Sequence, residues 1–233
     1  MSAEESKTSS NCRENASVPG EATPEDARAK RRGKVEKKRK KARPLDETAL
    51  RDLALSYVAR FATTGAKLEG YLLRKLRERG VAQDGDGRVQ TPDVAGLVER
   101  LIELGYVDDE AYARSRTRDL TARGYGARRV SQALWAAGVD ETTREETAPS
   151  EATLRRAAVL LAKKRRFGPF GLTPQDEEPA ETVRKRREKQ VAAMLRAGHK
   201  YEHVAFILDA PDEDEIDEWL IEAEDAEEEP DRW

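Results

Sequence analysis

The stretch "LIELGYVDDEAYARSRTRDLTARGYGARRVSQALWAAGV", residues 101–139, contains the most regular helical pattern of the chain. Apolar side chains recur along it at the spacing of a helix, and a Gly-Tyr-Gly break separates two helical runs. Asp108 is a favourable N-cap, and Asp109 and Glu110 lie where the helix dipole favours negative charge, so we interpret these acids as structural. Because the stretch has no histidine, no cysteine and no Ser/His/Asp grouping, we expect no catalytic site in it.

Helical spacing continues on both sides of this stretch. Apolar stripes run over residues 50–61, 68–76 and 94–102, and no segment alternates apolar and polar residues for long enough to predict a strand. A glycine that suits a left-handed helix end follows four of the helical runs, at Gly80, Gly105, Gly138 and Gly198. Thr64 is predicted to cap the next helix, and Thr91 to cap one that begins at Pro92.

A phrase of apolar residues that ends in glycine occurs three times along the chain. It reads "LRKLRERGV" at 73–81, "SQALWAAGV" at 131–139 and "VAAMLRAGH" at 191–199. Recurrence at this period is typical of tandem helical units that stack on one another. We therefore predict an all-α, elongated tandem array of helical repeats.

Charge is concentrated at the two ends of the chain. The 233 residues have a net charge of −3, but Lys and Arg crowd residues 27–43 while Asp and Glu crowd residues 209–233. We expect residues 1–45 to be a disordered basic tail, and residues 211–233 to be an acidic tail or a short helix. One cysteine allows no internal disulfide, and neither a membrane span nor a secretory signal is evident, so we expect a cytoplasmic protein.

Three segments together resemble the bacterial regulatory protein RecX family. They are "TTGAKLEGYLLRKLRERG", "VERLIELGYVDDEAYARSRTRDLTARGYGARRVSQALWAAGVDE" and "EKQVAAMLRAGHKYEHVAFIL". The resemblance covers roughly residues 48–208 and is strongest over 94–141. It implies three tandem three-helix repeats, which we expect at 46–107, 108–149 and 150–210.

The resemblance also implies a function. RecX proteins bind the RecA recombinase filament on single-stranded DNA, in its groove, and restrain its ATP hydrolysis, strand exchange and growth. The expected role is regulation of DNA repair, homologous recombination and the SOS response, by a monomer that is not an enzyme and needs no cofactor. The alternative is a helix-turn-helix regulator that places "GYGARRVSQALWAAGV" in the major groove of duplex DNA.

The chain departs from the family pattern at three places. Lys67 replaces a usual Glu, which removes half of a capping box, and Ala127 replaces a usual Pro. His199 and Lys200 follow Gly198 where the family has Phe and Ser, so we expect a weaker cap on the last helix.

Arginines and lysines are the candidate contacts with a partner or with DNA. Arg128 and Arg129 occupy the first turn of their predicted helix, where the dipole disfavours cations, which indicates another use such as an acidic patch or a phosphate. The alternative is a solvated face or internal pairs with Asp119 and Glu141. The full candidate set is Arg114, Arg118, Arg123, Arg128, Arg129, Lys163, Lys164, Arg165 and Arg166.

Two other signals receive a different interpretation. "HKYEH" at 199–203 has the spacing of a zinc-peptidase motif, but His199 directly follows a helix-ending glycine, so we predict no metal site. The acidic end contains a short apolar face made of Ile216, Leu220 and Ala223, with Trp219, which would add a last helix or fold back on basic parts of the chain.

Overall fold

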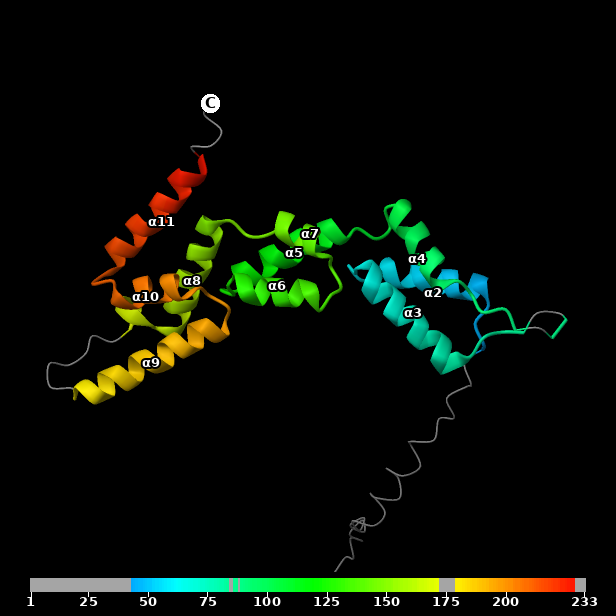
Figure 1. The fold of residues 1–233 in the computed structure, drawn as a ribbon, viewed down its shortest axis with the longest axis horizontal. Helices are drawn as coiled ribbons and strands as arrows, with labels where there is room; N and C mark the ends of the chain where they lie inside the picture. The colour runs from blue at the N-terminus through cyan, green and yellow to red at the C-terminus, as the bar shows by residue number, and fades with distance from the viewer. Residues whose placement is uncertain (1–42, 84–85, 88, 172–178, 229–233) are drawn as a thin grey trace, which may run out of the picture. The chain divides into compact units, whose positions relative to one another are not determined.

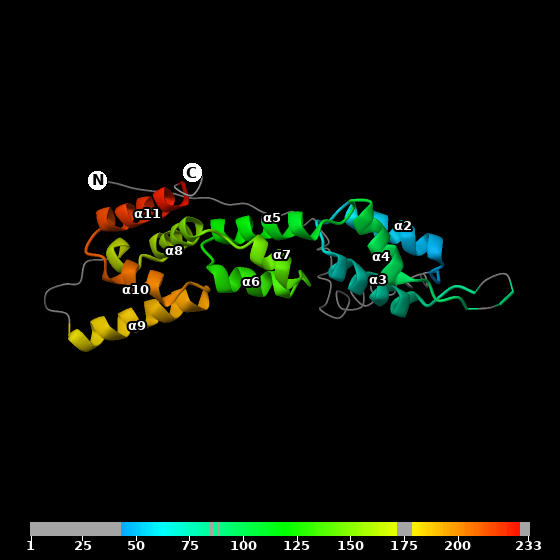
Figure 2. The ribbon, with the colours of Figure 1, turned by 45° about the horizontal axis from the view of Figure 1, so that its top comes forward.

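The computed structural model describes residues 43–83, 86–87, 89–171 and 179–228. Within these ranges the chain forms ten α-helices and one short 3₁₀ helix, with two isolated β-bridges and no strand (Figures 1 and 2). The predicted all-α fold is therefore confirmed. Most of the predicted basic tail, residues 1–42, lies outside the described residues.

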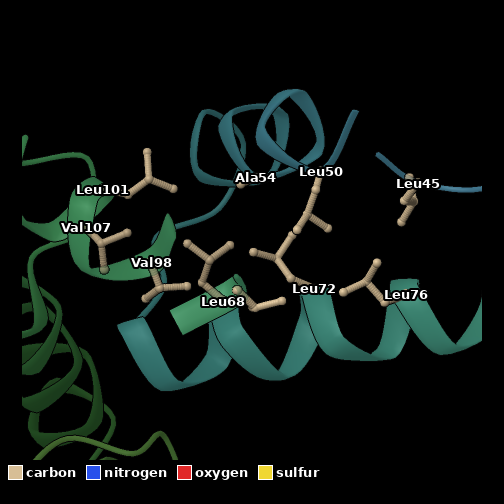
Figure 3. Packing of buried hydrophobic residues seen from close by; sticks show 10 residues of the cluster. Leu45, Leu50, Ala54, Leu68, Leu72, Leu76, Val98, Leu101 and Val107 are labelled. Atoms are coloured by element: carbon tan, nitrogen blue, oxygen red, sulfur yellow. The ribbon is translucent and has the colours of Figure 1, made fainter. Parts of the chain in front are cut away.

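The first group of helices packs around the leucine stripe of its second helix. It contains α2 (Glu47–Val58), α3 (Gly65–Arg79) and α4 (Val94–Glu103). Leu68, Leu72 and Leu76 share one face of α3 because they are four residues apart. Figure 3 shows them directed toward α2, where Leu50 and Ala54 are fully buried.

Leu45 moves the boundary that we predicted for the N-terminal tail. Its side chain is only 2% exposed and belongs to the core of the first group. Its backbone N–H donates to the carbonyl of Gly80, and its carbonyl accepts from the N–H of Ala82, both at 2.9 Å. A single leucine between Pro44 and Asp46 is too short a signal to be found by periodicity.

The second group contains α5 (Asp109–Ala122), α6 (Ala127–Trp135) and α7 (Glu141–Glu146). Val130 and Leu134 are four residues apart on α6 and are buried against α5. Ala113 and Leu120 of α5 complete this small core.

The third group contains α8 (Glu151–Arg165), the 3₁₀ helix η1 (Gly168–Phe170), α9 (Ala180–Arg196) and α10 (Tyr201–Asp209). Met194, Val204 and Ile207 are fully buried at its centre. Each group thus has its own cluster of buried side chains. The division into repeats at 46–107, 108–149 and 150–210 stays a prediction, with which the three clusters are consistent.

The acidic end of the chain adds helix α11 (Glu213–Glu228) to the third group. Ile216, Trp219 and Ala223 are buried on one side of it. Leu220, which we placed on the same face, is partly buried and packs against the same cluster. Of the two alternatives for this segment, the structure therefore has a packed helix through Glu228.

Side-chain caps begin most of the helices. Thr64 accepts from the N–H of Lys67 at 3.3 Å, and Asp108 accepts from Ala111 at 2.8 Å, as predicted. The prediction for Thr91 and Pro92 is wrong, because Asp93 is the N-cap of α4 and accepts from the N–H of Gly96 at 3.0 Å. An aspartate is at least as strong an N-cap as a threonine, and the helix begins two residues later than predicted, at Val94.

Helix ends also join the first group to the second. The Thr64 hydroxyl donates to the carbonyl of Ala137 at 2.5 Å, and the Gly65 N–H donates to the carboxylate of Asp109 at 2.9 Å. Lys67, which departs from the family pattern, donates to the Tyr112 hydroxyl at 2.5 Å. Its ammonium lies 4.5 Å from the centre of the Tyr112 ring. In place of the missing half of the capping box, Lys67 thus forms a contact between the first and second groups of helices.

The second and third groups meet through bare backbone at Gly126 and Gly198. The Gly126 N–H donates to the carbonyl of Ala197 at 3.0 Å, and the Arg128 N–H donates to that of Gly198 at 3.2 Å. A Cβ on Gly126 would lie 2.4 Å from the Gly198 carbonyl carbon. Gly198 also has a φ of +95°, which other residues rarely adopt. Neither position therefore has room for a side chain.

We expect Gly126→Ala to lower the free energy of unfolding by about 2 kcal/mol, because the added methyl would push the two helix ends apart. The matched control is Gly70→Ala on α3, where a Cβ meets nothing within 4 Å. That change should raise stability by about 0.5–1 kcal/mol, because alanine favours helix interiors. Urea unfolding measures both, and equal effects of the two variants would contradict the close contact.

We expect Trp219→Ala to cost about 3–5 kcal/mol of unfolding free energy, as for other buried tryptophans. The Trp219 ring stacks on Phe206 with centroids 4.6 Å apart, and the Arg155 guanidinium lies 4.6 Å from its centre. Ile221→Ala, at a side chain that is 56% exposed, should cost less than about 0.5 kcal/mol. Thermal unfolding compares them, and an equally mild Trp219→Ala would show that α11 contributes little.

Candidate partner-binding surface

The two histidines of the zinc-like motif make contacts inside the fold. The Nε2 of His199 donates to the carbonyl of Gly124 at 3.0 Å, and the Nε2 of His203 lies 2.6 Å from the Oε1 of Glu151. In the part of the chain that the structure describes, no group of three or more His, Cys, Asp or Glu side chains is placed to hold a metal ion. His199 instead joins the third group to the second, and α10 has no side-chain cap, as we expected.

Burial lowers the pKa of His199 below 6.5, and His203 lowers it further, although the bond to Gly124 opposes the change. The side chain is 5% exposed, and its Nδ1 has no hydrogen-bond partner. Because the carbonyl of Gly124 can only accept, Nε2 carries the proton of a neutral ring.

Glu151, in the first turn of α8, receives several donors. Burial raises the pKa of its carboxyl, but hydrogen bonds from His203, Arg155 and Lys200 outweigh burial, so the net pKa lies below 4.5. The carboxylate thereby ties the start of α8 to His203 and Lys200 near the start of α10. It is a structural carboxylate.

Most arginines of α5 pair along their own helix. Arg114 pairs with Glu110, and Asp119 lies 2.9 Å from both Arg116 and Arg123. The predicted alternative of an internal pair with Asp119 is therefore confirmed for two arginines. Among the described residues Arg118 has no acidic partner, and it is exposed on α5.

Arg128 has an internal use that the sequence did not predict. Its guanidinium donates to the carbonyl of Leu195 at 3.1 Å, at the C-terminal end of α9. The negative end of the α9 dipole thus offsets the unfavourable position of this cation at the start of α6. Arg129 donates to Gln132 at 3.1 Å and is exposed.

Trp135 stands out as an exposed aromatic residue in the second group. Its side chain is 69% exposed, and it borders a shallow hollow that Arg128 and Arg144 also line. Sequence reasoning missed it, although it follows the buried Leu134 and therefore falls outside the apolar stripe of α6. The other residues lining the hollow are Ala127, Ser131 and Gln132.

The four cations at the end of α8 differ in what they contact. Lys163 faces α11, where it lies 3.7 Å from Glu213. Lys164 reaches the carbonyl of Arg123 at 3.5 Å, so candidates from the second and third groups meet there. Arg165 and Arg166 are exposed and have no carboxylate partner among the described residues.

The basic run of α9 was also missed. Lys185, Arg186 and Lys189 line a hollow together with Arg165 and Arg166, which lie far from them in the sequence. The run "VRKRREKQV" at 183–191 was visible, but only the fold places it beside α8. The nine candidates therefore form no single patch: Arg114 and Arg118 lie along α5, Arg128 lies beside Trp135, and Arg123 lies beside Lys164.

Within the described ranges, no helix combines the length and the apolar character that a membrane span requires. Groups of short helices that are joined through their ends and carry exposed cations define the chain as a helical-repeat protein.

This chain belongs to the RecX family of regulatory proteins. Residues 108–147 match the family model described as RecX, second three-helix domain. The regulatory protein RecX of Myxococcus xanthus is 32% identical over 181 residues, which cover 76% of this chain and 93% of that protein. The regulatory protein RecX of Thermus thermophilus is 34% identical over 112 residues, which cover 48% of this chain and 71% of that protein.

A solved structure shares the fold. The crystal structure of RecX from Lactobacillus salivarius superposes with a TM-score of 0.51 at 20% identity, covering 70% of this chain and 96% of that one. This likeness supports the arrangement of helices described above.

We expect the protein to lose stability as the pH falls below 6.5, because the unfolded chain takes up a proton that the buried His199 resists. The contribution of His199 to the free energy of unfolding is complete above pH 6.5, and it is lost as the pH falls toward the lowered pKa of the folded state. His199→Gln keeps a donor for Gly124 without this titration. Its urea midpoint should therefore change less than that of the original chain between about pH 7 and about pH 5.5. If the urea midpoint of His199→Gln falls with pH as much as that of the original chain, His199 is not the group responsible.

Proposed function

We propose that the chain binds the RecA recombinase filament on single-stranded DNA and inhibits its ATPase, strand exchange and growth. Membership of the RecX family supports this function, as does the match of residues 108–147 to the second domain of that family. In this proposal the chain acts in the cytoplasm as a monomer, performs no catalysis and needs no cofactor.

The observation that carries the proposal is the surface around Trp135. Tryptophan and arginine dominate the energetics of protein interfaces, because they combine a large apolar area with polar groups. Here Trp135 is exposed and lies with Arg128 and Arg144 beside a hollow that no acid of the described ranges lines. A partner surface with an apolar and acidic patch is complementary to it.

Arg129, which is bonded to Gln132 at this hollow, extends the surface, and Arg118 is a second exposed cation on the neighbouring helix α5. Both are exposed, and neither has a carboxylate partner among the described residues. Arg128 is a poorer choice for mutation, because it also holds the end of α9 through Leu195. Its replacement would weaken the junction between the second and third groups and so confuse binding with stability.

The helix-turn-helix alternative is less well supported. A recognition helix reads bases with the residues near its N-terminus. At the N-terminus of α6, the Gly126 and Arg128 amides are bonded to Ala197 and Gly198 of the third group. Entry of this end into a major groove would require the two groups to separate.

We expect the full chain to slow ATP hydrolysis by RecA on single-stranded DNA. Trp135→Ala should raise the concentration needed for half-inhibition by about tenfold or more, because the central aromatic anchor is lost. The control is Tyr201→Ala on α10, an aromatic side chain that is 62% exposed and distant in sequence. Absence of any effect of the full chain on hydrolysis would refute the proposed function.

We expect the double variant Arg118→Ala, Arg129→Ala to bind the RecA–DNA filament more weakly, with the larger loss at low salt, because exposed charges are screened by ions. Binding is measured by pulling down filaments at two salt concentrations. A loss below about twofold, which is less than half a kcal/mol, would remove these two arginines from the interface.

A further inference from the structure

A basic hollow lies between the end of α8 and the N-terminal half of α9. It has a volume of about 470 Å³, and five cations and the ring of Phe167 border it. The cations are Arg165, Arg166, Lys185, Arg186 and Lys189. Among the described residues, no Asp or Glu side chain lines it. We refer to it as the α8–α9 hollow.

The lining of this hollow breaks the usual pattern of a helix that packs on another. Thr182, Lys185, Arg186 and Lys189 share one face of α9, since they are three or four residues apart. Further along, the same face continues through Ala193 and Met194, and Met194 is fully buried in the third core. One helix face is therefore cationic for two turns and apolar afterwards, which indicates that its first part has a function other than packing.

Within the described residues, three of the cations that line the hollow have no carboxylate partner. Lys185 pairs with Glu181 at 2.6 Å, across the outer surface of α9. Arg165, Arg166 and Lys189 have no carboxylate partner within the described residues. The like charges of Arg165, Arg166 and Lys189 repel each other, and an anionic ligand would relieve this repulsion.

The backbone at Arg166 adds an independent observation. Its φ is 56°, and it is the only residue other than glycine with a positive φ among those described. The position directly follows α8, where glycine is the favoured residue because a Cβ is disfavoured in this conformation. An arginine here indicates that its side chain has a use that glycine cannot meet.

The dipole of α8 explains only part of this arrangement. Cations in the last turn of a helix are stabilised by its carbonyl end, and this applies to Arg165 and Arg166. It does not apply to Lys185, Arg186 or Lys189, because these residues lie in the N-terminal half of α9. The convergence of the two sets therefore requires another explanation.

A second basic hollow adjoins the first and shares Arg165 and Phe167 with it. Arg123 and Lys164 also line it, and the Lys164 ammonium reaches the carbonyl of Arg123. Cations thus continue from the α8–α9 hollow toward the end of α5. A chain of phosphates, rather than one isolated anion, matches such a continuous row.

We infer that the α8–α9 hollow binds the phosphodiester backbone of DNA. Arg166 and Arg165 hold phosphate oxygens with their planar guanidinium groups, Lys189 and Lys185 supply further charge from α9, and the row continues over Lys164. This inference goes beyond the proposed function, because the hollow binds DNA in the absence of RecA. The two ideas can therefore fail separately.

The test is binding of the full chain to labelled single-stranded DNA, and to a duplex of the same length, by fluorescence anisotropy at several salt concentrations. We expect Arg166→Gly combined with Lys189→Gln to weaken binding about tenfold and to reduce the slope of log affinity against log salt by about one per cation removed. Because glycine suits the backbone at 166, the melting temperature of Arg166→Gly should not fall. Folding is thereby separated from binding.

The matched control is Arg51→Gln combined with Arg77→Gln, which removes two exposed charges from α2 and α3. We expect this control to lose less than about twofold in affinity, which is under half a kcal/mol. A second measurement reads the site directly: added DNA should protect Lys189 from acetylation and leave Lys200 reactive. This reading does not depend on cations elsewhere in the chain, including those of residues 27–43.

Loss of affinity by the α8–α9 variant for either form of DNA, with Lys189 protected, supports the inference. Equal affinity and equal salt dependence of the variant and the original chain overturn it. A loss seen only with the RecA filament, and not with bare DNA, also overturns it, because the hollow would then bind an acidic protein surface.

Discussion

The meeting of the α6 start with the α9 end is the constraint on which the rest of the structure depends. Both helix ends leave backbone groups without partners within their own helix. Here the N–H groups at the start of α6 donate to the carbonyls at the end of α9. The exchange needs close approach, which glycine at 126 and at 198 permits. The Arg128 guanidinium and the His199 ring add two bonds at the rim of the same junction. One residue of this junction, Arg128, is among those that the sequence analysis proposed as contacts with a partner.

Because the groups are joined through helix ends, the exposed faces of the helices are available for other contacts. On α5 and α6 those faces carry exposed cations and Trp135, and on α8 and α9 they carry the basic hollow. Each group keeps its own small apolar core, so a change on an exposed face does not reach the packing. Contacts with a partner are therefore separable from stability at most surface positions, with Arg128 as the exception.

Local signals in the sequence predicted the helices well. The leucines of α3, the caps at Thr64 and Asp108 and the glycine at 198 each follow from a few neighbouring residues, and the structure confirms them. The candidate site was harder to predict, because it depends on residues that are distant in the chain. Nothing near Arg128 in sequence reveals the carbonyl of Leu195, and nothing near Arg166 reveals Lys189. The acidic C-terminal segment was ambiguous for a similar reason, since its helix is fixed by burial of Trp219 in another element's core.

Helix α11 gives the third core an acidic cover. Its inner side fills the apolar surface of α8 with Ile216 and Trp219, while Glu224 pairs with Arg156 and Glu227 accepts from the backbone of Ala152. The outer side carries carboxylates such as Asp217 and Glu218, which are exposed. The acidic helix therefore covers apolar side chains of the third group on one side and presents carboxylates to the solvent on the other.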